Sequence, residues 1–449
     1  MPDHATSTDP AVQAQLDRLF AHGPGTDVLG LDRITRLLAR LGDPHRHLPP
    51  TFHVAGTNGK GSTIAFQRAI LEAAGLAVHV YTSPHLVRFH ERIRLGRPGG
   101  GRLVGEGALV EALRACESAN GSEPITVFEI TTAAAFLLFS EAPADVLLLE
   151  VGLGGRGDAT NVIARPEAAI VTAIGHDHAE YLGTDLAGIA REKAGIFKRG
   201  CPAVIAPQEH GVADAALREA AERVGAAPIL VGNQEFSAHE ERGRLVYQDE
   251  HGLLDLPRPR LVGRHQIANA GTAIAGLRAS GFGRLPLSAF EAGLLAAEWP
   301  GRLQRLTTGR LAALAPPGSE LWLDGGHNQD GGRALAAAMA DLEERSPAPL
   351  VLVAGLLGTK DVEGFLRPFS GLAREVIAVP IPGQAAALPA QAVAAAAARV
   401  GLTASRAAGV ESALDALHDT IWERPPRVLF CGSLYLAGEV LALNGTPPT

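Results

Sequence analysis

Short apolar segments alternate with segments of helical periodicity along most of the chain. The strand candidates in the first part are continuously apolar rather than alternating in polarity, which is typical of parallel strands buried on both faces of a sheet. Because these strands alternate with helices, the pattern predicts a doubly wound α/β sheet whose ligand crevice lies at the carboxyl ends of the strands. The strands predicted in this part are 52–55, 78–81, 146–151, 169–174 and 203–205.

The pattern changes between residues 236 and 259, where charges and prolines predict an antiparallel insertion. A helix is predicted over 265–280, and the segment 298–302 has the composition of a linker. The α/β alternation then restarts, which predicts a second α/β domain of about 150 residues. We therefore expect an N-terminal domain over 1–297 and a C-terminal domain over 303–449. The strands predicted in the second domain are 321–323, 350–354, 376–379 and 428–431.

The composition indicates a folded chain with many turns. Of its 449 residues, 46% are hydrophobic and 20% are charged, which argues against disorder. The net charge of −8 gives no sign of a basic surface for nucleic acid or anionic lipid. The 52 glycines and 30 prolines are not periodic, which excludes collagen and leaves open what so many glycines are for.

Cysteine content and hydropathy indicate the compartment. Cys116, Cys201 and Cys431 are widely spaced and include no C-x-x-C pair, which fits reduced thiols better than disulfides or a zinc site. No segment reaches the ~18 consecutive apolar residues that a membrane span needs. The N-terminal segment lacks the apolar stretch of a signal peptide. We therefore expect a cytoplasmic protein.

The strongest local signal is a glycine-rich loop between a predicted strand and a predicted helix. Such a loop binds phosphate through inward-facing backbone N–H groups and the positive end of the helix. Lys60 is placed to reach the outer phosphates, and the Ser62 hydroxyl to bind Mg²⁺. The general pattern G-x-x-x-x-G-K-[ST] is not met, because Val54 replaces its first glycine and Gly61 separates Lys60 from Ser62. The alternative is a turn without a ligand, which a lysine at this position disfavours. The residues expected at the phosphates are Gly56, Thr57, Asn58, Gly59, Lys60, Gly61 and Ser62.

The string GTNGKGS after HVA resembles the phosphate loop of the folylpolyglutamate synthase and dihydrofolate synthase family, in the Mur ligase superfamily. Further blocks match the family's order from about residue 30 to the end. Gly326 and Gln329 depart from the pattern, where the family usually has alanine and proline, and these changes affect backbone stiffness more than chemistry. The matching blocks are 82–86, 150–161, 174–178, 192–196, 324–328 and 432–435.

This resemblance implies a fold and an activity. The expected fold is α/β, with a P-loop Mur-ligase-like central ATPase domain and a smaller Rossmann-like C-terminal domain. The implied activity is ATP-dependent ligation of L-glutamate to dihydropteroate, to reduced folates such as tetrahydrofolate, or to both. The reaction would pass through an acyl phosphate and release ADP and phosphate.

The resemblance also implies a metal site at the edge of the sheet. Glu150 ends a buried predicted strand and His178 follows the next one, and a buried carboxylate needs a partner such as Mg²⁺. The family pattern implies that Ser83, Glu150 and His178 hold this ion. The alternatives are an ion-paired or helix-capping carboxylate and a structural histidine. Lys193 resembles the family's carbamylated lysine, and its alternative is an ordinary surface lysine.

The catalytic residues implied in this way are Lys60, His178, Lys193 and Arg302. Arg302 resembles the arginine that reaches from the hinge to the ATP phosphates. Asp324 and His327 would complete the nucleotide site, and Asn269 is expected on the adenine side, although each of the three could simply make hydrogen bonds between domains. The residues expected to contact the other substrates are Arg92 and Ser433 for glutamate and Phe128 for the pterin. An ordinary surface salt bridge and a turn hydroxyl are the alternatives for Arg92 and Ser433.

Two other functions compete with this one. A peptidoglycan-building Mur ligase would carry a further domain before the phosphate loop, and 55 residues before Gly56 are too few for it. A regulatory nucleotide-binding module would keep the fold without the chemistry, and the presence of Glu150, His178 and Lys193 argues against it. We expect a monomer that acts on small molecules, with no nucleic-acid or membrane partner.

Overall fold

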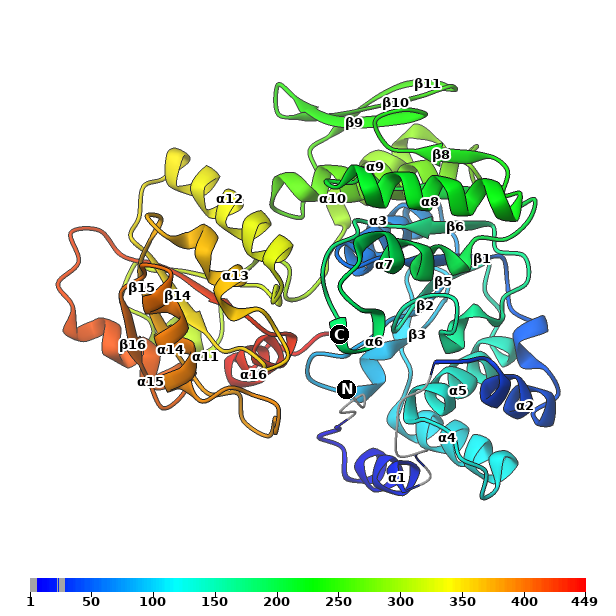
Figure 1. Cartoon of the computed structure of the whole chain (residues 1–449), viewed down its shortest axis with the longest axis horizontal. Helices are drawn as coiled ribbons and strands as arrows, with labels where there is room; N and C mark the ends of the chain where they lie inside the picture. Colours follow the sequence, from blue (N-terminus) through cyan, green and yellow to red (C-terminus); the bar gives the residue numbers. More distant parts are fainter. Residues whose placement is uncertain (1–5, 22, 24–28) are drawn as a thin grey trace.

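The computed structural model describes residues 6–21, 23 and 29–449. Two α/β bodies lie side by side, and the smaller one contains the C-terminal part of the chain (Figure 1). Within the described residues, the larger sheet has the strand order β4-β3-β2-β5-β1-β6-β7-β8, and its strands from β2 to β8 are parallel. These strands are β1 (Thr51–Ala55), β2 (Val78–Tyr81), β3 (Ile93–Leu95), β4 (Arg102–Leu103), β5 (Val146–Glu150), β6 (Ala168–Val171), β7 (Ala203–Ile205) and β8 (Ile229–Val231).

The mainly parallel α/β fold predicted from the sequence is thus confirmed. The strand predicted over 169–174 is shorter than expected, because β6 ends at Val171 and the chain enters the loop that leads to His178. Helices cover both faces of the sheet. Those among the described residues before the hinge are α1 (Pro10–Phe20), α2 (Asp32–Arg40), α3 (Lys60–Ala73), α4 (Glu106–Asn120), α5 (Val127–Glu141), α6 (Ala179–Leu182), α7 (Leu186–Lys193), α8 (Gly211–Val224), α9 (Arg264–Arg278) and α10 (Leu287–Ala296).

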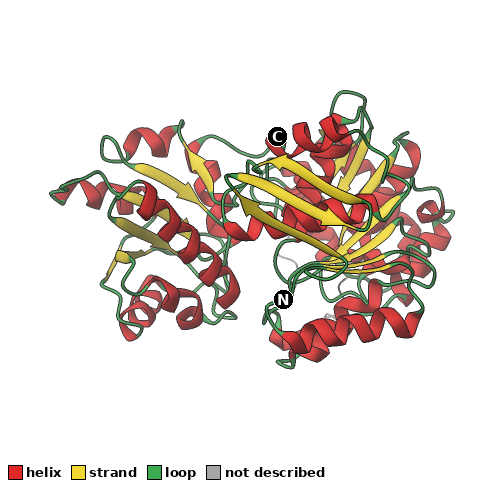
Figure 2. Cartoon of the chain, turned by 90° about the horizontal axis from the view of Figure 1, so that it is seen from above, coloured by secondary structure: helices red, strands yellow, loops and turns green. Residues whose placement is uncertain are grey.

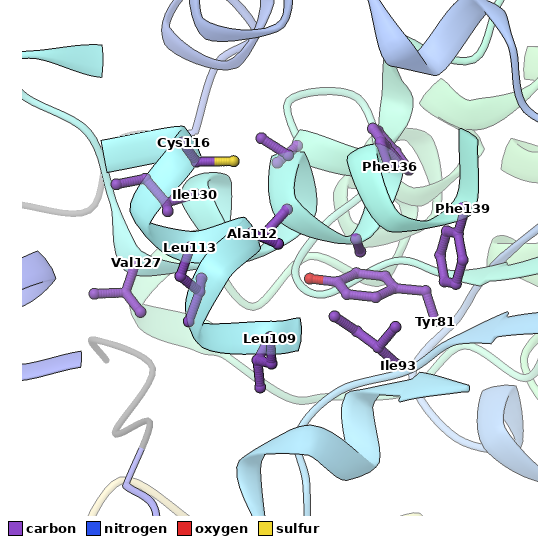
Figure 3. Packing of buried hydrophobic residues seen from close by; sticks show 14 of the residues in the cluster. Tyr81, Ile93, Leu109, Ala112, Leu113, Cys116, Val127, Ile130, Phe136 and Phe139 are labelled. Carbon is purple, nitrogen blue, oxygen red and sulfur yellow. The ribbon is translucent and has the colours of Figure 1, made fainter. Parts of the chain in front are cut away.

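One face of the larger sheet packs against α4 and α5. Tyr81 and Ile93 of the sheet meet Leu109 and Leu113 of α4 and Phe136 of α5 in an apolar cluster (Figure 3). Burial of such side chains contributes about 1.5–3 kcal/mol each and fixes α5 against the sheet.

A capping box fixes where α5 begins. The Thr126 hydroxyl accepts the Glu129 N–H at 3.1 Å, and the Glu129 carboxylate accepts the Thr126 N–H at 2.8 Å. Arg33 Nε also donates to both oxygens of the Glu129 carboxylate, at 2.9 and 3.0 Å. The first turn of α5, with Phe128, therefore starts at a defined position beside the cavity described below.

The insertion predicted between 236 and 259 is a three-stranded antiparallel sheet in the order β11-β10-β9, within residues that are all described. It stands over the larger body (Figure 2). It packs closely on α9, since a Cβ on Gly271 would come within 2.3 Å of Ala238. The helix predicted over 265–280 corresponds to α9. The strands of the insertion are β9 (Phe236–Glu241), β10 (Arg244–Asp249) and β11 (Gly252–Pro257).

The second sheet lies within 304–431, a range described throughout, in the order β12-β13-β17-β14-β15-β16. All of its strand pairs are parallel except β12 with β13. Its strands are β12 (Gln304–Leu306), β13 (Glu320–Leu323), β14 (Leu350–Ala354), β15 (Ala373–Ala378), β16 (Ala404–Arg406) and β17 (Arg427–Cys431). Its helices are α11 (Arg310–Leu314), α12 (Gln329–Arg345), α13 (Val362–Leu366), α14 (Ala390–Arg399), α15 (Val410–Ala416) and α16 (Leu434–Asn444).

Short 3-10 helices connect several of these elements. They lie at Pro44–Arg46, Phe89–Arg92, Ala159–Val162, Ala194–Ile196, Arg367–Phe369 and Leu417–Asp419. None of the helices in the described part of the chain combines the length and apolar character needed to cross a membrane.

Candidate active site

A cavity of about 1040 Å³ lies where the loops at the carboxyl ends of the larger sheet's strands face the second body. Most residues predicted for the site line this cavity, and they come from both bodies. They are Thr57, Asn58, Gly59, Lys60, Gly61, Ser62, Ser83, Phe128, Glu150, His178, Asn269, Arg302, Asp324, His327 and Ser433. Gly56, Lys193 and Arg92 are not part of the cavity wall.

The phosphate loop connects β1 to α3, and its backbone requires glycine. Gly56 has φ +146°, and a Cβ there would lie 1.9 Å from Thr172 Oγ1. The Trp299 indole packs closely against the loop at Gly61. A Cβ on Gly61 would lie within 2.6 Å of this indole, so the position has room only for glycine. Lys60 begins α3, and its Nζ donates to Gly56 O at 3.1 Å and to Thr57 O at 3.3 Å. The loop therefore has the shape and charge of a phosphate site.

Glu150 is a buried acid beside this lysine. It ends β5, its Oε2 accepts the Ser83 N–H at 3.2 Å, and its Oε1 lies 3.9 Å from Lys60 Nζ. Burial raises the pKa of Glu150, although the charge of Lys60 and the Ser83 N–H partly oppose this. A buried carboxylate whose ion-pair partner lies 3.9 Å away can accept a further positive charge.

His178 approaches the same cavity from the loop after β6. The His178 side chain is still 40% exposed. Its partial burial at the cavity and, after it, the charge of Lys360 lower the pKa of His178, against the opposing effect of the Asp177 carboxylate. Its imidazole is therefore neutral, which is the form that binds a metal. Ser83, Glu150 and His178 line the same cavity. A hydroxyl, a carboxylate and a neutral imidazole are donor types that divalent cations accept.

A second cluster of possible ligands is already neutralised. Within the part of the chain that the structure describes, the group of His and acidic side chains close enough to share an ion is Glu209, His210 and Asp330. Arg333 pairs with both Glu209, at 3.1 Å, and Asp330. The Arg333 guanidinium is thus already the counter-ion of these two carboxylates, in the place that a metal ion would take.

Lys193 lies directly behind the phosphate loop. It ends α7, is 5% exposed, and its Nζ donates to Gly56 O at 3.0 Å. Burial and the charge of Lys60 lower the pKa of Lys193 to about 7, against the opposing effect of Asp177. The alternative of an ordinary surface lysine is therefore wrong.

Arg302 and Asp324 lie where the segment 298–302, predicted to be a linker, meets the second sheet. Arg302 NH1 donates to Gly301 O at 3.0 Å. Both carboxylate oxygens of Asp324 accept backbone N–H groups, from Leu303 at 2.8 Å and from Gly326 at 2.6 Å. Asp324 thus fixes the backbone that carries Arg302, and it holds Arg302 at the cavity edge.

Arg92 and Ser433 have different environments. Arg92 is 1% exposed, its Nε donates to His85 Nδ1 at 3.1 Å, and its guanidinium lies 4.7 Å from the Phe89 ring centre. Arg92 is therefore not part of the cavity wall, and its burial does not fit the alternative of an exposed surface residue. Ser433 lines the cavity, and its Oγ accepts the Tyr435 N–H at 3.1 Å.

Several polar residues at the cavity were not identified from the sequence. Asp177 lies within the recognised block 174–178, between His176 and His178. Lys360 follows β14, so the rule that functional residues follow parallel strands could have identified it. Asn328, which ends a recognised block, does not line the cavity itself, but it exchanges hydrogen bonds with Asn58 of the cavity wall at 3.1 and 3.3 Å.

Asn269 lies against the phosphate loop. A Cβ on Gly59 would approach Asn269 Oδ1 to 2.4 Å, and Asn269 Nδ2 donates to Gln266 Oε1 at 3.0 Å. Its proximity to adenine remains a prediction.

Comparison with known proteins identifies the family. Residues 54–277 match the Mur ligase middle domain. The chain is 35% identical over 419 residues to the dihydrofolate synthase/folylpolyglutamate synthase of Escherichia coli, covering 92% of this chain and 90% of that protein. It is 34% identical to the folylpolyglutamate synthase of Lacticaseibacillus casei, covering 91% and 92%.

Solved structures agree over nearly the whole length. The structure of E. coli FolC in complex with DHPP and ADP superposes with a TM-score of 0.85 at 33% identity, covering 98% of both chains. That of the bifunctional Yersinia pestis enzyme with AMPPNP and Mn ion superposes with a TM-score of 0.82 at 33% identity, covering 97% and 98%. The chain therefore belongs to the folylpolyglutamate synthase/dihydrofolate synthase family.

Proposed function

We propose that this protein is an ATP-dependent ligase that joins L-glutamate to dihydropteroate, to reduced folates, or to both. The observation that carries the proposal is one cavity in which a phosphate loop, a buried acid and cations from two bodies meet. The E. coli relative named dihydrofolate synthase/folylpolyglutamate synthase matches 92% of this chain. A solved relative carries AMPPNP, Mn and L-glutamate together, which supports the same set of ligands here.

The reaction we propose forms an amide in two steps. The pterin substrate's carboxylate attacks the γ-phosphorus of ATP, which breaks its bond to the bridging oxygen, giving ADP and an acyl phosphate. The glutamate amine then attacks the acyl carbon, loses a proton, and phosphate leaves. Lys60 and Arg302 would stabilise charge on the transferring phosphoryl oxygens, and closure of the two bodies would exclude water.

We propose that Ser83, Glu150 and His178 hold a Mg²⁺ ion. The buried carboxylate and the neutral imidazole support this assignment. The ion would supply positive charge for phosphate and carboxylate oxygens. A solved relative contains AMPPNP and Mn ion, which supports a divalent metal beside the nucleotide.

We propose carbamylation of Lys193. Only a neutral amine reacts with CO₂, and a pKa of about 7 gives Lys193 a large neutral fraction. The product would be anionic, so that it would no longer repel Lys60 or the metal. Intact-mass measurement or ¹³CO₂ labelling followed by NMR would detect the adduct, and its absence from Lys193 under CO₂-rich buffer would contradict the assignment.

The remaining assignments follow the position of each residue. We propose that Asn269, Asp324 and His327 serve the nucleotide, that Ser433 serves glutamate, and that Phe128 serves the pterin. We propose no direct contact between Arg92 and glutamate, because Arg92 does not line the cavity. We further propose that the domains span 1–297 and 303–449 with a hinge at 298–302, and that the protein acts as a cytoplasmic monomer.

A phosphate-release assay tests the function. Purified protein would receive ATP, Mg²⁺ and L-glutamate, with dihydropteroate, tetrahydrofolate or a methylene derivative in separate reactions. We expect the release of phosphate to depend on both glutamate and at least one pterin. If no pterin stimulates release, the proposed function is wrong. The pterin that does so separates dihydrofolate synthase activity from folylpolyglutamate synthase activity.

A further inference from the structure

A buried carboxylate joins the two bodies at the edge of the cavity. Asp177, in the loop after β6 of the larger body, has a side chain that is 8% exposed. Its Oδ2 accepts hydrogen bonds from His327 Nε2 at 3.2 Å and from Asn328 Nδ2 at 3.3 Å, and its Oδ1 pairs with Lys360 Nζ. All of these partners belong to the second body, in the loops after β13 and β14. We call this group the Asp177 hub.

The hub also contacts two parts of the active site within the larger body. Asp177 Oδ1 accepts the backbone N–H of His178 at 2.8 Å. Asn328, which donates to Asp177, also exchanges hydrogen bonds with Asn58 of the phosphate loop. One carboxylate therefore connects the second body, the loop that carries His178 and the phosphate loop.

The Asp177 hub differs in burial and in location from the Arg264–Asp341 ion pair, which also joins the two bodies. Arg264 Nε donates to Asp341 Oδ2 at 2.9 Å, but the Arg264 side chain is 74% exposed and neither residue lines the cavity. Exposed pairs of this kind contribute about 0–1 kcal/mol. In the hub, by contrast, Asp177 and Lys360 are withdrawn from solvent, with side chains 8% and 10% exposed. Loss of one partner leaves the other without a counter-charge in a buried place.

We propose that Asp177 is a positioning residue that couples docking of the second body to the arrangement of His178 and the phosphate loop. This inference rests on the proposed ligase function. When the bodies dock, Lys360, His327 and Asn328 reach the carboxylate, and Asn328 then holds Asn58. We expect the hub to open for substrate entry and product release and to form again in each turnover. Asp177 itself does not contact the reacting atoms.

The test separates docking from turnover. Cysteines introduced at the exposed positions Ala215 of α8 and Ala398 of α14 would carry spin labels, one on each body, while the native cysteines are buried. The distance between the labels would be measured with a nonhydrolysable ATP analogue and Mg²⁺. The variants are Asp177→Asn and Lys360→Met, with Asp341→Asn as the matched control that breaks the exposed pair.

We expect Asp177→Asn and Lys360→Met each to shift the label distances towards a longer, broader distribution and to lower kcat roughly a hundredfold, as misplacement by about 1 Å can do. The effects of the two changes should not add in the double variant, because both break one ion pair. Asp341→Asn should match the parent protein in both measurements.

Either of two results would overturn the proposal. The first is a docked distance unchanged in Asp177→Asn and Lys360→Met. The second is a loss of turnover in Asp177→Asn alone with Lys360→Met unaffected, since Asp177 would then act only through His178. The label distances do not depend on catalysis, so absence of pterin-dependent turnover in the parent protein would refute the ligase function without deciding the hub.

Discussion

Replacing Lys193 by methionine should stabilise the protein while abolishing its activity. The pKa of Lys193 falls from 10.5 to about 7 on folding, chiefly through burial. The unfolded chain therefore holds a proton at neutral pH that the native state binds much more weakly. By linkage, this difference in the pKa of Lys193 lowers the free energy of unfolding by about 4 kcal/mol at pH 7. Methionine has no charge to bury and a similar length.

The hydrogen bond lost in this variant offsets only part of the gain. Lys193 Nζ donates to Gly56 O at 3.0 Å, but that carbonyl also accepts Lys60 Nζ at 3.1 Å and so keeps a partner. The loss is then about 1 kcal/mol. We expect the free energy of unfolding of Lys193→Met to exceed that of the parent protein by about 3 kcal/mol at pH 7.

The pH dependence of the stability difference between Lys193→Met and the parent protein tests the same reasoning independently. Between about pH 7 and 10.5 the unfolded state binds more protons at Lys193 than the native state, so the parent protein gains stability as pH rises. The advantage of Lys193→Met should therefore shrink by about 1.4 kcal/mol per pH unit between pH 8 and 10. Below pH 7 the advantage should change little.

Urea unfolding monitored by circular dichroism at pH 7, 8 and 9, in CO₂-depleted buffer, would measure this advantage. Lys198→Met is the matched control, because Lys198 is only partly buried and its Nζ donates to Asn161 Oδ1 at 2.8 Å. Lys198→Met should raise the free energy of unfolding by less than Lys193→Met does. A Lys193→Met protein no more stable than the parent at pH 7, or with an advantage independent of pH, would refute the reasoning.

The other predictions concern the phosphate loop and the metal. Lys60→Ala and Glu150→Ala should each abolish pterin-dependent phosphate release while circular dichroism stays unchanged; retained turnover in either would mean that the phosphates or the metal lie elsewhere. Gly56→Ala should lower the free energy of unfolding by about 3 kcal/mol or more in urea titrations, because φ is +146° and Thr172 Oγ1 lies 1.9 Å from the new Cβ. Gly75→Ala, with φ +86° and open space, should cost only about 1 kcal/mol, and equal losses would show that crowding plays no part. Removal of divalent metal with EDTA should stop turnover and reduce the rise in melting temperature caused by ATP; an ATP effect that survives metal removal in full would contradict the proposed coupling of metal and nucleotide.

The sequence predicted what depends on local pattern. Continuous apolar runs located the strands, and glycines between 56 and 61 located the phosphate loop, because both depend on neighbouring residues. The end of β6 was placed too late, at 174 rather than Val171, since Ala173 and Ile174 continue the apolar run into the loop. Hydrophobicity alone does not show where pairing with the next strand stops.

Features that depend on distant contacts were harder to predict. The resemblance singled out Lys193, but its local sequence left a surface lysine as the alternative, and its burial behind Gly56 depends on contacts distant in the sequence. Arg92 lies in a segment rich in charge, but His85 and Phe89 hold it away from the cavity. The pairing of Asp177 with Lys360 joins residues 183 positions apart, and nothing in the local sequence of either residue indicates it.

The contact between Trp299 and the phosphate loop has an optical consequence. The half-buried indole lies in the hinge and touches the loop at Gly61, so one chromophore borders both the nucleotide site and the pivot between the bodies. The other tryptophans, Trp322 and Trp422, belong to the second body, where they lie beside Arg305 and Arg374. We therefore expect the native fluorescence of Trp299 to change when nucleotide binds at the proposed phosphate loop, so that binding can be followed without an attached dye.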